Sequence, residues 1–149
     1  MEEKKEGCPF CDIALGKVPS RRVYEDEHVV AVLDINPASQ GHMILIPKKH
    51  FSTLLELPSS LMTYMASMCK QLSWAVLRTM KAQGTTIILA QGEAAGQTIP
   101  HIFFHIIPRK DQDGLKIVAL PQQPFSLQDL VDVKAMIAKG MKQEMEGGA

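Results

Sequence analysis

Two histidines lie four residues apart in an apolar run, at positions 101 and 105. Successive side chains of a β-strand point to opposite faces, so His101, Phe103 and His105 would share one face, and Ile102 and Phe104 the other. A buried imidazole needs a hydrogen-bond partner, and two imidazoles flanking a phenyl ring are unusual in a strand that only packs. The pattern therefore indicates a chemically active face on this strand.

Cys8 and Cys11 form a second candidate site near the start of the chain. This spacing suits a zinc site that takes two further ligands from elsewhere, but it also matches the redox pair of thioredoxin-like proteins or two small buried residues at a turn. The redox interpretation requires a preceding strand, whereas the residues before Cys8 are mostly charged, so zinc is favoured. His50 follows an apolar strand and is a candidate third ligand, although a lone histidine in a loop is usually just solvated.

Two further features are compatible with a nucleotide site. Asp34 ends a β-prone run before a turn, where a carboxylate either caps the turn or hydrogen-bonds a ribose diol. The residue alone favours the cap. The loop at 91–97 carries two glycines and can present backbone N–H groups to an anion, but it fits no Walker-type pattern and is weak support by itself.

The strands that must position these residues are read from hydrophobic periodicity. Two β-prone runs separated by an acidic turn predict a hairpin, and an apolar run without polar positions predicts a central strand. The predicted elements are a short helical segment at 13–17, a hairpin at 22–34, and strands at 42–47, 85–90, 101–107 and 115–120.

Two helices complete the prediction. A long helix is expected at 58–83, with Pro58 in its first turn and Gly84 as its stop. A capping box formed by Ser126 and Asp129 opens a last helix with a broad apolar stripe, and the tail at 147–149 should be disordered. On the long helix we expect a buried thiol at Cys69, a packed Trp74, and a core face of Leu61, Met65, Met68, Leu72, Ala75 and Met80.

The composition bounds the class of protein. At 149 residues, with 46% hydrophobic and 21% charged residues, the chain suits one soluble globular domain. Lys and Arg total 16, as do Asp and Glu, so there is no basic field to attract nucleic acid. No signal peptide is visible, and no apolar run approaches the ~18 residues of a membrane span. We therefore expect a cytoplasmic protein whose cysteines are thiols or metal ligands rather than disulfides.

Taken in order, the motifs resemble those of the histidine triad (HIT) family. The resemblance implies an α+β fold with a central antiparallel sheet of about five strands, one long helix and a C-terminal helix, and a homodimer. One HIT domain would span residues 1–149, with its core at 8–110 and a helical extension at 126–146. The shared segments are Cys-x-x-Cys, Leu33-Asp34-Ile35-Asn36-Pro37, Gly41-His42 with Ile46-Pro47-Lys48-Lys49-His50, Ala95-Gly96-Gln97-Thr98 and His101-Ile102-Phe103-Phe104-His105-Ile106-Ile107.

The resemblance also implies a chemistry and two departures from it. The family comprises nucleotidyl hydrolases and transferases, and the zinc-containing bacterial and archaeal type resembles nucleoside phosphoramidate hydrolases. In its signature His-φ-His-φ-His-φ-φ, with φ apolar, the middle histidine attacks the α-phosphate and forms a nucleotidyl-histidine intermediate. Phe103 stands at that position, and a phenyl ring has no lone pair to form the bond. The second departure is Ala90, near which family members commonly have an asparagine that contacts the nucleotide.

The remaining positions match the family's functional residues. By resemblance, Asp34 binds the ribose diol, Gln97 and Thr98 contact the phosphate and assist the leaving group, and His105 contacts a non-bridging phosphate oxygen. The zinc ligands would be Cys8, Cys11, His50 and His101, a closed set that makes the ion structural. The apolar slot for the base would comprise Phe10, Ile13, Val32, Leu33 and Ile35.

Three functions compete on this basis. The first is a zinc-stabilised protein that binds a purine nucleotide such as AMP or GMP, with weak or absent hydrolysis. The second is an active phosphoramidate or dinucleotide hydrolase that uses His105 or water directly. The third is a non-catalytic interaction protein. All three are expected to be homodimeric, without nucleic acid or membrane partners.

Overall fold

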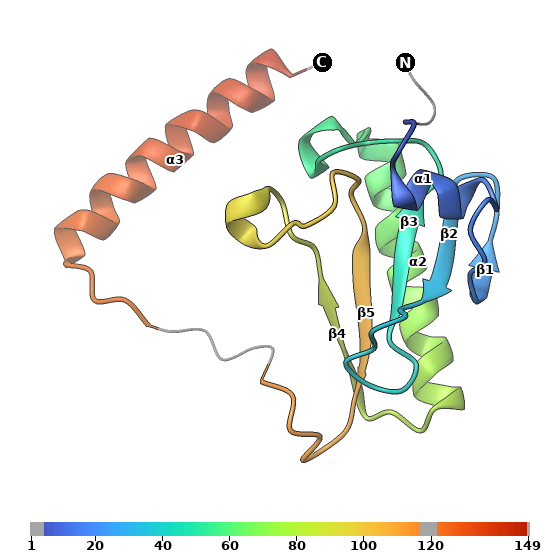
Figure 1. Ribbon diagram of the computed structural model, residues 1–149. Helices are drawn as coiled ribbons and strands as arrows, with labels where there is room; N and C mark the ends of the chain where they lie inside the picture. The colour runs from blue at the N-terminus through green and yellow to red at the C-terminus, as the bar shows by residue number, and fades with distance from the viewer. Residues whose placement is uncertain (1–4, 117–121, 149) are drawn as a thin grey trace. The chain divides into compact units, whose positions relative to one another are not determined.

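In the computed structural model, which describes residues 5–116 and 122–148, the chain forms two compact units, residues 1–115 and 116–149. The first unit contains a five-stranded antiparallel sheet of order β1-β2-β3-β5-β4 (Figure 1), as expected for an α+β fold. The expectation of a single domain over the whole chain stays a prediction. The strands are β1 Arg22–Glu25, β2 Val29–Leu33, β3 Met43–Pro47, β4 Gly84–Ile88 and β5 Phe104–Arg109.

The centre of the sheet lies where the apolar runs predict it. β3 pairs with β2 on one side and with β5 on the other, and all five of its residues are buried. The register places Val32 opposite Ile44, and Ile44 in turn opposite His105. Continuous apolar runs suit a strand covered on both faces, which is the position that β3 occupies.

Each face of the sheet has its own core. Helix α2, Ser59–Thr79, covers one face, where Ile102, Phe104 and Ile106 pack with Met65. The short helix α1, Pro9–Ala14, lies on the other face (Figure 1), where Phe103 packs against a cluster of Cys8, Phe10, Cys11, Ala14, Val30, Val32, Ile44 and Ile46. The predicted alternation of positions 102 to 106 is therefore confirmed.

Strand β5 begins later than expected. His101, Ile102 and Phe103 precede it, because the N–H of Ile102 donates to the carbonyl of Phe51 (2.7 Å) instead of joining the ladder with β3. Pro47, at the end of β3, has no N–H to continue that ladder. The prediction of a strand from residue 101 is therefore wrong at its first three positions.

Both helices of the first unit also differ from their predicted bounds. α1 covers residues 9–14 rather than 13–17, because Cys8 caps it and accepts from the N–H of Cys11 (3.4 Å). α2 ends at Thr79, and Lys81 adopts the left-handed conformation (φ 53°) that ends it. Gly84 is therefore not the stop, since it opens β4 opposite Arg109.

The core face of α2 is largely as predicted. Met65, Met68, Cys69 and Leu72 are buried, and Leu61 and Met80 pack against them partly buried. Val76 is buried in place of Ala75, which is exposed. Trp74 was expected to pack, but it is 52% exposed beneath the guanidinium of Arg78, 5.2 Å from the ring centroid. The buried face of α2 therefore includes position 76 rather than position 75, which the spacing predicts.

The second unit consists of helix α3, Leu127–Gly147, and the segment before it. The predicted capping box is confirmed: Ser126 Oγ accepts from the N–H of Asp129 (3.1 Å), and Asp129 accepts from the N–H of Ser126 (3.2 Å). No described residue of α3 is buried, and Gly147 is helical rather than disordered. The strand expected at 115–120 is absent at Leu115 and Lys116, and its other residues lie outside the described part of the chain.

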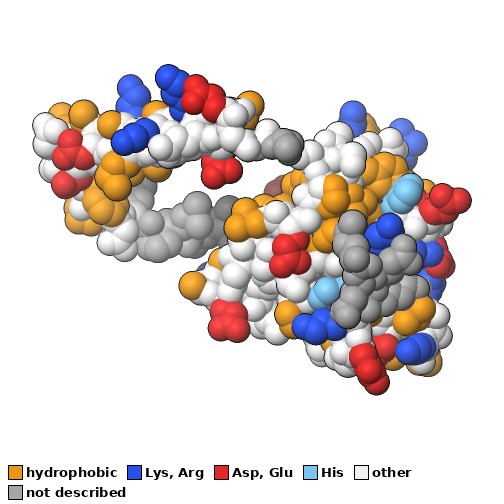
Figure 2. Space-filling model, turned by 90° about the horizontal axis from the view of Figure 1, so that it is seen from above, with side chains coloured by type: hydrophobic (Ala, Val, Ile, Leu, Met, Phe, Trp, Pro, Cys, Tyr) orange, Lys and Arg blue, Asp and Glu red, His pale blue; other side chains and the backbone are white. Residues whose placement is uncertain are grey.

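The face of the molecule seen in Figure 2 carries charged side chains of both signs. On the face seen in Figure 2, basic and acidic side chains are interspersed, in keeping with the balanced charge of the sequence. Among the described helices, none is both long and apolar enough to cross a bilayer.

Candidate metal centre and nucleotide site

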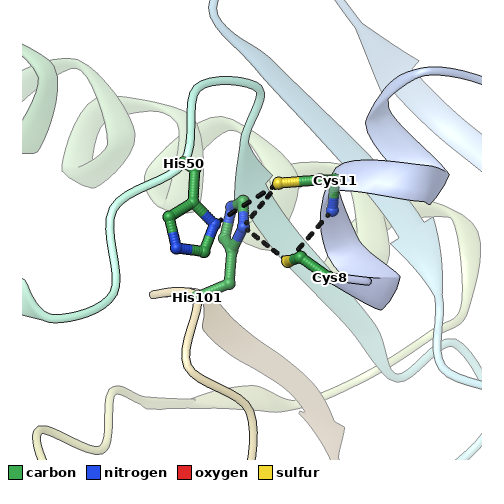
Figure 3. Close-up of side chains that lie close together, drawn as sticks. All are labelled: Cys8, Cys11, His50 and His101. Carbon is green, nitrogen blue, oxygen red and sulfur yellow. Dashed lines mark hydrogen bonds between the residues drawn. The ribbon is translucent and has the colours of Figure 1, made fainter. Parts of the chain in front are cut away.

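Four side chains from three separate segments converge at one end of the sheet (Figure 3). Cys8 is the N-cap residue of α1 and Cys11 lies within that helix, His50 comes from the loop after β3, and His101 from the segment just before β5. The His101 Nδ1 atom lies 3.3 Å from Cys8 Sγ and 3.5 Å from Cys11 Sγ, and His50 Nδ1 lies 3.3 Å from Cys11 Sγ. The four predicted metal ligands are thus brought together, with all ligand atoms within 4.8 Å of one another.

The donor set fits a zinc ion in chemistry and in spacing. Tetrahedral zinc with bonds of about 2.0–2.3 Å places neighbouring ligand atoms about 3.6 Å apart. His101 Nε2 lies 2.9 Å from the carbonyl oxygen of Pro47, which can only accept, so this nitrogen carries the proton and Nδ1 keeps its lone pair. His50 Nε2 is similarly placed 3.2 Å from Ser52 Oγ. His101 therefore aims an unprotonated nitrogen at the sulfur atoms, and His50 can do the same, because the Ser52 hydroxyl can accept a hydrogen bond from its Nε2.

Burial sets the protonation of this cluster. His101 has no exposed surface, and burial lowers its pKa to about 4 against a hydrogen bond to Pro47 that raises it. The neutral imidazole is the form that binds a metal. Burial also raises the pKa of the Cys11 thiol, a shift that a bound cation would oppose by stabilising the thiolate.

Asp34, His42 and His105 form a second polar cluster, on the sheet beside Phe103. His42 Nε2 lies 2.9 Å from His105 Nδ1 and 3.5 Å from Asp34 Oδ2. The N–H of Ala38 donates to His42 Nδ1 (2.9 Å), so in neutral His42 the proton resides on Nε2. His42 then donates to His105 Nδ1, and the proton of neutral His105 lies on Nε2. In this tautomer of His42, Nδ1 accepts from Ala38 and Nε2 carries the proton, so His42 has no free lone pair for a metal although the three side chains lie close together.

Both imidazoles of this cluster are biased toward the neutral form. Burial lowers the pKa of His42 against the attraction of Asp34, and burial together with the charge of His42 lowers the pKa of His105. Asp34 also caps the turn, because its Oδ1 accepts from the N–H of Asn36 (2.8 Å). The two interpretations of Asp34 are compatible, since Oδ2 faces the histidines.

A phenyl ring separates the two clusters. The Phe103 ring lies 4.9 Å from that of His105 and 4.8 Å from that of Phe10, edge-on to both. Phe10 in turn contacts His101. The position between the first and last histidines of the run therefore carries an apolar side chain packed among aromatic rings.

The residues predicted for an apolar slot are only partly together. Phe10, Ile13 and Val32 lie in the cluster around Phe103, whereas Leu33 is exposed on the other face of β2 and Ile35 is 88% exposed. Their role in binding a base stays a prediction. Ile44 and Ile99 belong to the same cluster although the sequence does not predict them for the slot; Ile44 lies there because strand register places it opposite His105. His42 lies in the shared Gly41-His42 segment, from which the sequence alone predicts no role for its side chain.

The side chain of Gln97 is hydrogen-bonded inside the glycine-containing loop at 91–97 and is not directed to solvent. Gly92 and Gly96 have positive φ angles (85° and 93°), which residues with a side chain rarely adopt. Gln97 is buried and its amide bonds within the chain, whereas Thr98 is exposed. A cavity of about 240 Å³ lies here, lined by Ser52, Thr53, Gly92, Glu93, Gln97, Thr98, Ile99 and Pro100. Phosphate contacts by Gln97 and Thr98 stay predictions.

Comparison with known proteins defines the class. The HIT domain model matches residues 16–112, and the chain therefore belongs to the HIT family. Among curated relatives, an adenylylsulfatase of Arabidopsis thaliana is 41% identical over 72% of this chain, which spans about half (55%) of that protein. An adenosine 5'-monophosphoramidase of Saccharomyces cerevisiae is 32% identical over 89% of this chain and 82% of its own length.

Solved structures share the fold. A crystal structure from Streptococcus mutans covers 95% of this chain and 89% of its own, with a TM-score of 0.87 and 34% identity. A zinc-bound histidine triad family protein from Mycobacterium smegmatis covers 93% of this chain and 98% of its own, with a TM-score of 0.70 and 31% identity. The α+β fold and the family assignment are thus confirmed.

Proposed function

We propose that this chain is a zinc-stabilised protein that binds a purine nucleotide such as AMP or GMP in the cytoplasm and hydrolyses nucleotide conjugates weakly or not at all. Two relatives are named for reactions of adenosine nucleotides, which supports the ligand class. A zinc-bound structural relative and the Cys₂His₂ cluster support the metal.

One observation carries the proposal. Phe103 stands between His101 and His105, where the family signature has its nucleophile, and its ring packs against Phe10 and His105. The site thus combines a polar cluster suited to ribose and phosphate with an apolar side chain at the reacting position. Loss of a covalent nucleophile lowers the catalytic rate by a factor of up to roughly 10⁶. Positioning and electrostatics alone can still keep the rate ~10³-fold above that of the uncatalysed reaction in water.

The nucleotide would contact groups that face the Phe103 side of the sheet. Asp34 Oδ2 would accept from the ribose hydroxyls, while Oδ1 stays on the turn. His105 would donate its Nε2–H to a phosphate oxygen, the role that its tautomer favours. Thr98 would add a hydroxyl, and the base would rest on the apolar cluster that contains Phe10 and Val32.

The zinc ion would be structural. Cys8, Cys11, His50 and His101 complete a tetrahedron and leave no open position for substrate or water. Coordination would join α1 to the ends of β3 and β5, which are far apart in sequence.

His105 is a poor replacement for the missing nucleophile. Its Nδ1 accepts from His42, and the Nε2 of the neutral ring carries the proton, so no lone pair is directed to a substrate. Its position two residues along the strand, ~6.6 Å away at strand rise, would also require the substrate to move.

The deciding experiment compares turnover of an adenosine phosphoramidate by the parent chain and by Phe103→His, with Phe103→Gln as a polar control without a nucleophile. We expect the histidine variant alone to gain activity, by roughly 10³-fold or more. Turnover by the parent chain at a rate near that of Phe103→His would contradict the proposed loss of activity. Calorimetry with AMP and GMP tests the proposed nucleotide binding. If no heat of binding is detected at millimolar nucleotide, the alternative of a non-catalytic interaction protein is favoured.

We propose a homodimer through the β4 edge. β4 is a terminal strand of the sheet, and unpaired strand edges are templates for pairing. Ile87 on β4 is 45% exposed and Trp74 on α2 is 52% exposed, on neighbouring elements joined by a hydrogen bond from Thr85 to Ser73 (3.2 Å). Sedimentation should give a dimer that Trp74→Glu converts to monomer, whereas a monomeric parent chain would exclude this interface.

A further inference from the structure

Two glutamine side chains tie the loop at 91–98 to the segment that follows the metal ligand His50. Gln97 Nε2 donates to the carbonyl oxygens of Ser52 (2.6 Å) and Ile99 (3.0 Å), and its Oε1 accepts from the N–H of Gly92 (2.9 Å). Gln91 Oε1 accepts from the N–H of Leu54 (2.7 Å). Both hydrogens of the Gln97 amide and its oxygen are therefore engaged inside the chain.

The partners of Gln97 are adjacent to metal ligands. Ser52 lies two residues after His50, and its hydroxyl is the group that His50 Nε2 contacts (3.2 Å). Ile99 lies two residues before His101. One buried side chain, 9% exposed, is thus bonded to the backbone beside both histidines of the Cys₂His₂ cluster.

The same side chain also determines the shape of the loop. Through Gly92 it closes residues 92–97 into a compact turn, in which the N–H of Gln97 also donates to the Gly92 carbonyl (3.1 Å). Thr98 follows directly. A displacement of His50 or His101 would therefore be transmitted through Ser52, Ile99 and the Gln97 amide to the loop that carries Thr98.

We infer that Gln97 is a positioning residue that couples the metal cluster to the loop at 91–98, so that zinc and a nucleotide phosphate bind cooperatively. The phosphate half rests on the proposed function, but the coupling of the metal to the loop does not. Because linkage is reciprocal, zinc should strengthen nucleotide binding by the same factor as the nucleotide strengthens zinc binding. A factor of about tenfold is expected, within the usual range for such couplings.

The test is hydrogen exchange of the full chain, followed in peptides that cover residues 91–98. Zinc-loaded parent protein should exchange there about tenfold more slowly than chelated protein, and Gln97→Leu should lose most of this difference. Gln83→Leu is the matched control, since Gln83 also bonds through its amide, to Asp111, but contacts neither the cluster nor the loop. Equal exchange with and without zinc in the parent would overturn the inference.

A second comparison applies if chelation unfolds the chain. The rate at which excess chelator removes zinc is compared for the parent, Gln97→Leu and Gln83→Leu, and faster removal from Gln97→Leu alone supports the coupling. Equal removal rates would overturn it. AMP affinity and zinc affinity are then measured each in the presence of the other. If AMP does not bind at all, the proposed function fails, while the exchange result still decides whether Gln97 couples the metal to the loop.

Discussion

Replacing His42 by leucine tests the hydrogen-bonded relay that orients His105. His42 is 5% exposed, accepts from the N–H of Ala38 (2.9 Å) and lies 2.9 Å from His105 Nδ1. Leucine has a similar bulk but removes both hydrogen bonds. Glutamine is the matched control, because its amide retains an acceptor and a donor without titrating.

The expected magnitude follows from the two groups left unpaired. An unsatisfied buried donor or acceptor costs about 1–3 kcal/mol. The His105 side chain is 29% exposed, so water can replace part of its loss, and we expect the free energy of unfolding to fall by about 2–4 kcal/mol in total. For a chain of this size this corresponds to a decrease in melting temperature of roughly 5–15 °C.

The assay combines thermal unfolding with nitrogen NMR of the His105 ring and calorimetry with AMP. In the leucine variant, the His105 ring should populate both neutral tautomers. AMP affinity should fall by about tenfold, which corresponds to the loss of one charge-assisted hydrogen bond. The glutamine variant should remain close to the parent in all three measurements. A leucine variant that melts within 1–2 °C of the parent, a shift of less than about 1 kcal/mol, and whose His105 keeps its proton on Nε2 would refute this role of His42.

Three further outcomes are expected. Cys11→Ser should reduce bound zinc below one ion per chain and lower the melting temperature, as measured by elemental analysis and calorimetry; unchanged metal content would reject the site. Burial is the main cause that lowers the pKa of His42 and of His105 in the folded chain. As the pH falls below about 6.5, the unfolded chain therefore binds more protons than the folded chain. Stability to urea should then be lower near pH 5 than near pH 7.5, and the reverse slope would contradict this. Ser126→Ala should destabilise α3 by about 1 kcal/mol and reduce helical circular dichroism, whereas an unaltered spectrum would argue against the cap.

The sequence predicts best where local pattern and tertiary packing agree. The continuous apolar run of β3 belongs at the centre of any sheet, and the Cys₂His₂ set follows from matching motifs. The predicted first helix, at 13–17, lies too late in the chain, although Pro9 after the capping residue Cys8 is itself a start signal.

Other features depend on contacts that no local pattern contains. The start of β5 is decided by Pro47 and Phe51, which are more than fifty residues away in sequence. The end of α2 is set by Lys81 in a conformation usually taken by glycine. The roles of His42 and Gln97 depend on backbone groups of Ala38 and Ser52, so motif matching alone could only give Gln97 a ligand contact.

The carbonyl of Pro47 has a consequence for assembly. It lies at the end of β3 and accepts the Nε2–H of His101, so the orientation of this predicted metal ligand depends on the register of the strands. A one-residue slip of β3 against β5 would move that carbonyl by about 3.3 Å and turn adjacent side chains to the opposite face. The complete cluster also requires α1 to meet residues about ninety positions later, a closure of long loops that is slow to form. Metal capture at this place would therefore depend on the register of the sheet, because only a correctly registered sheet brings all four predicted ligands together.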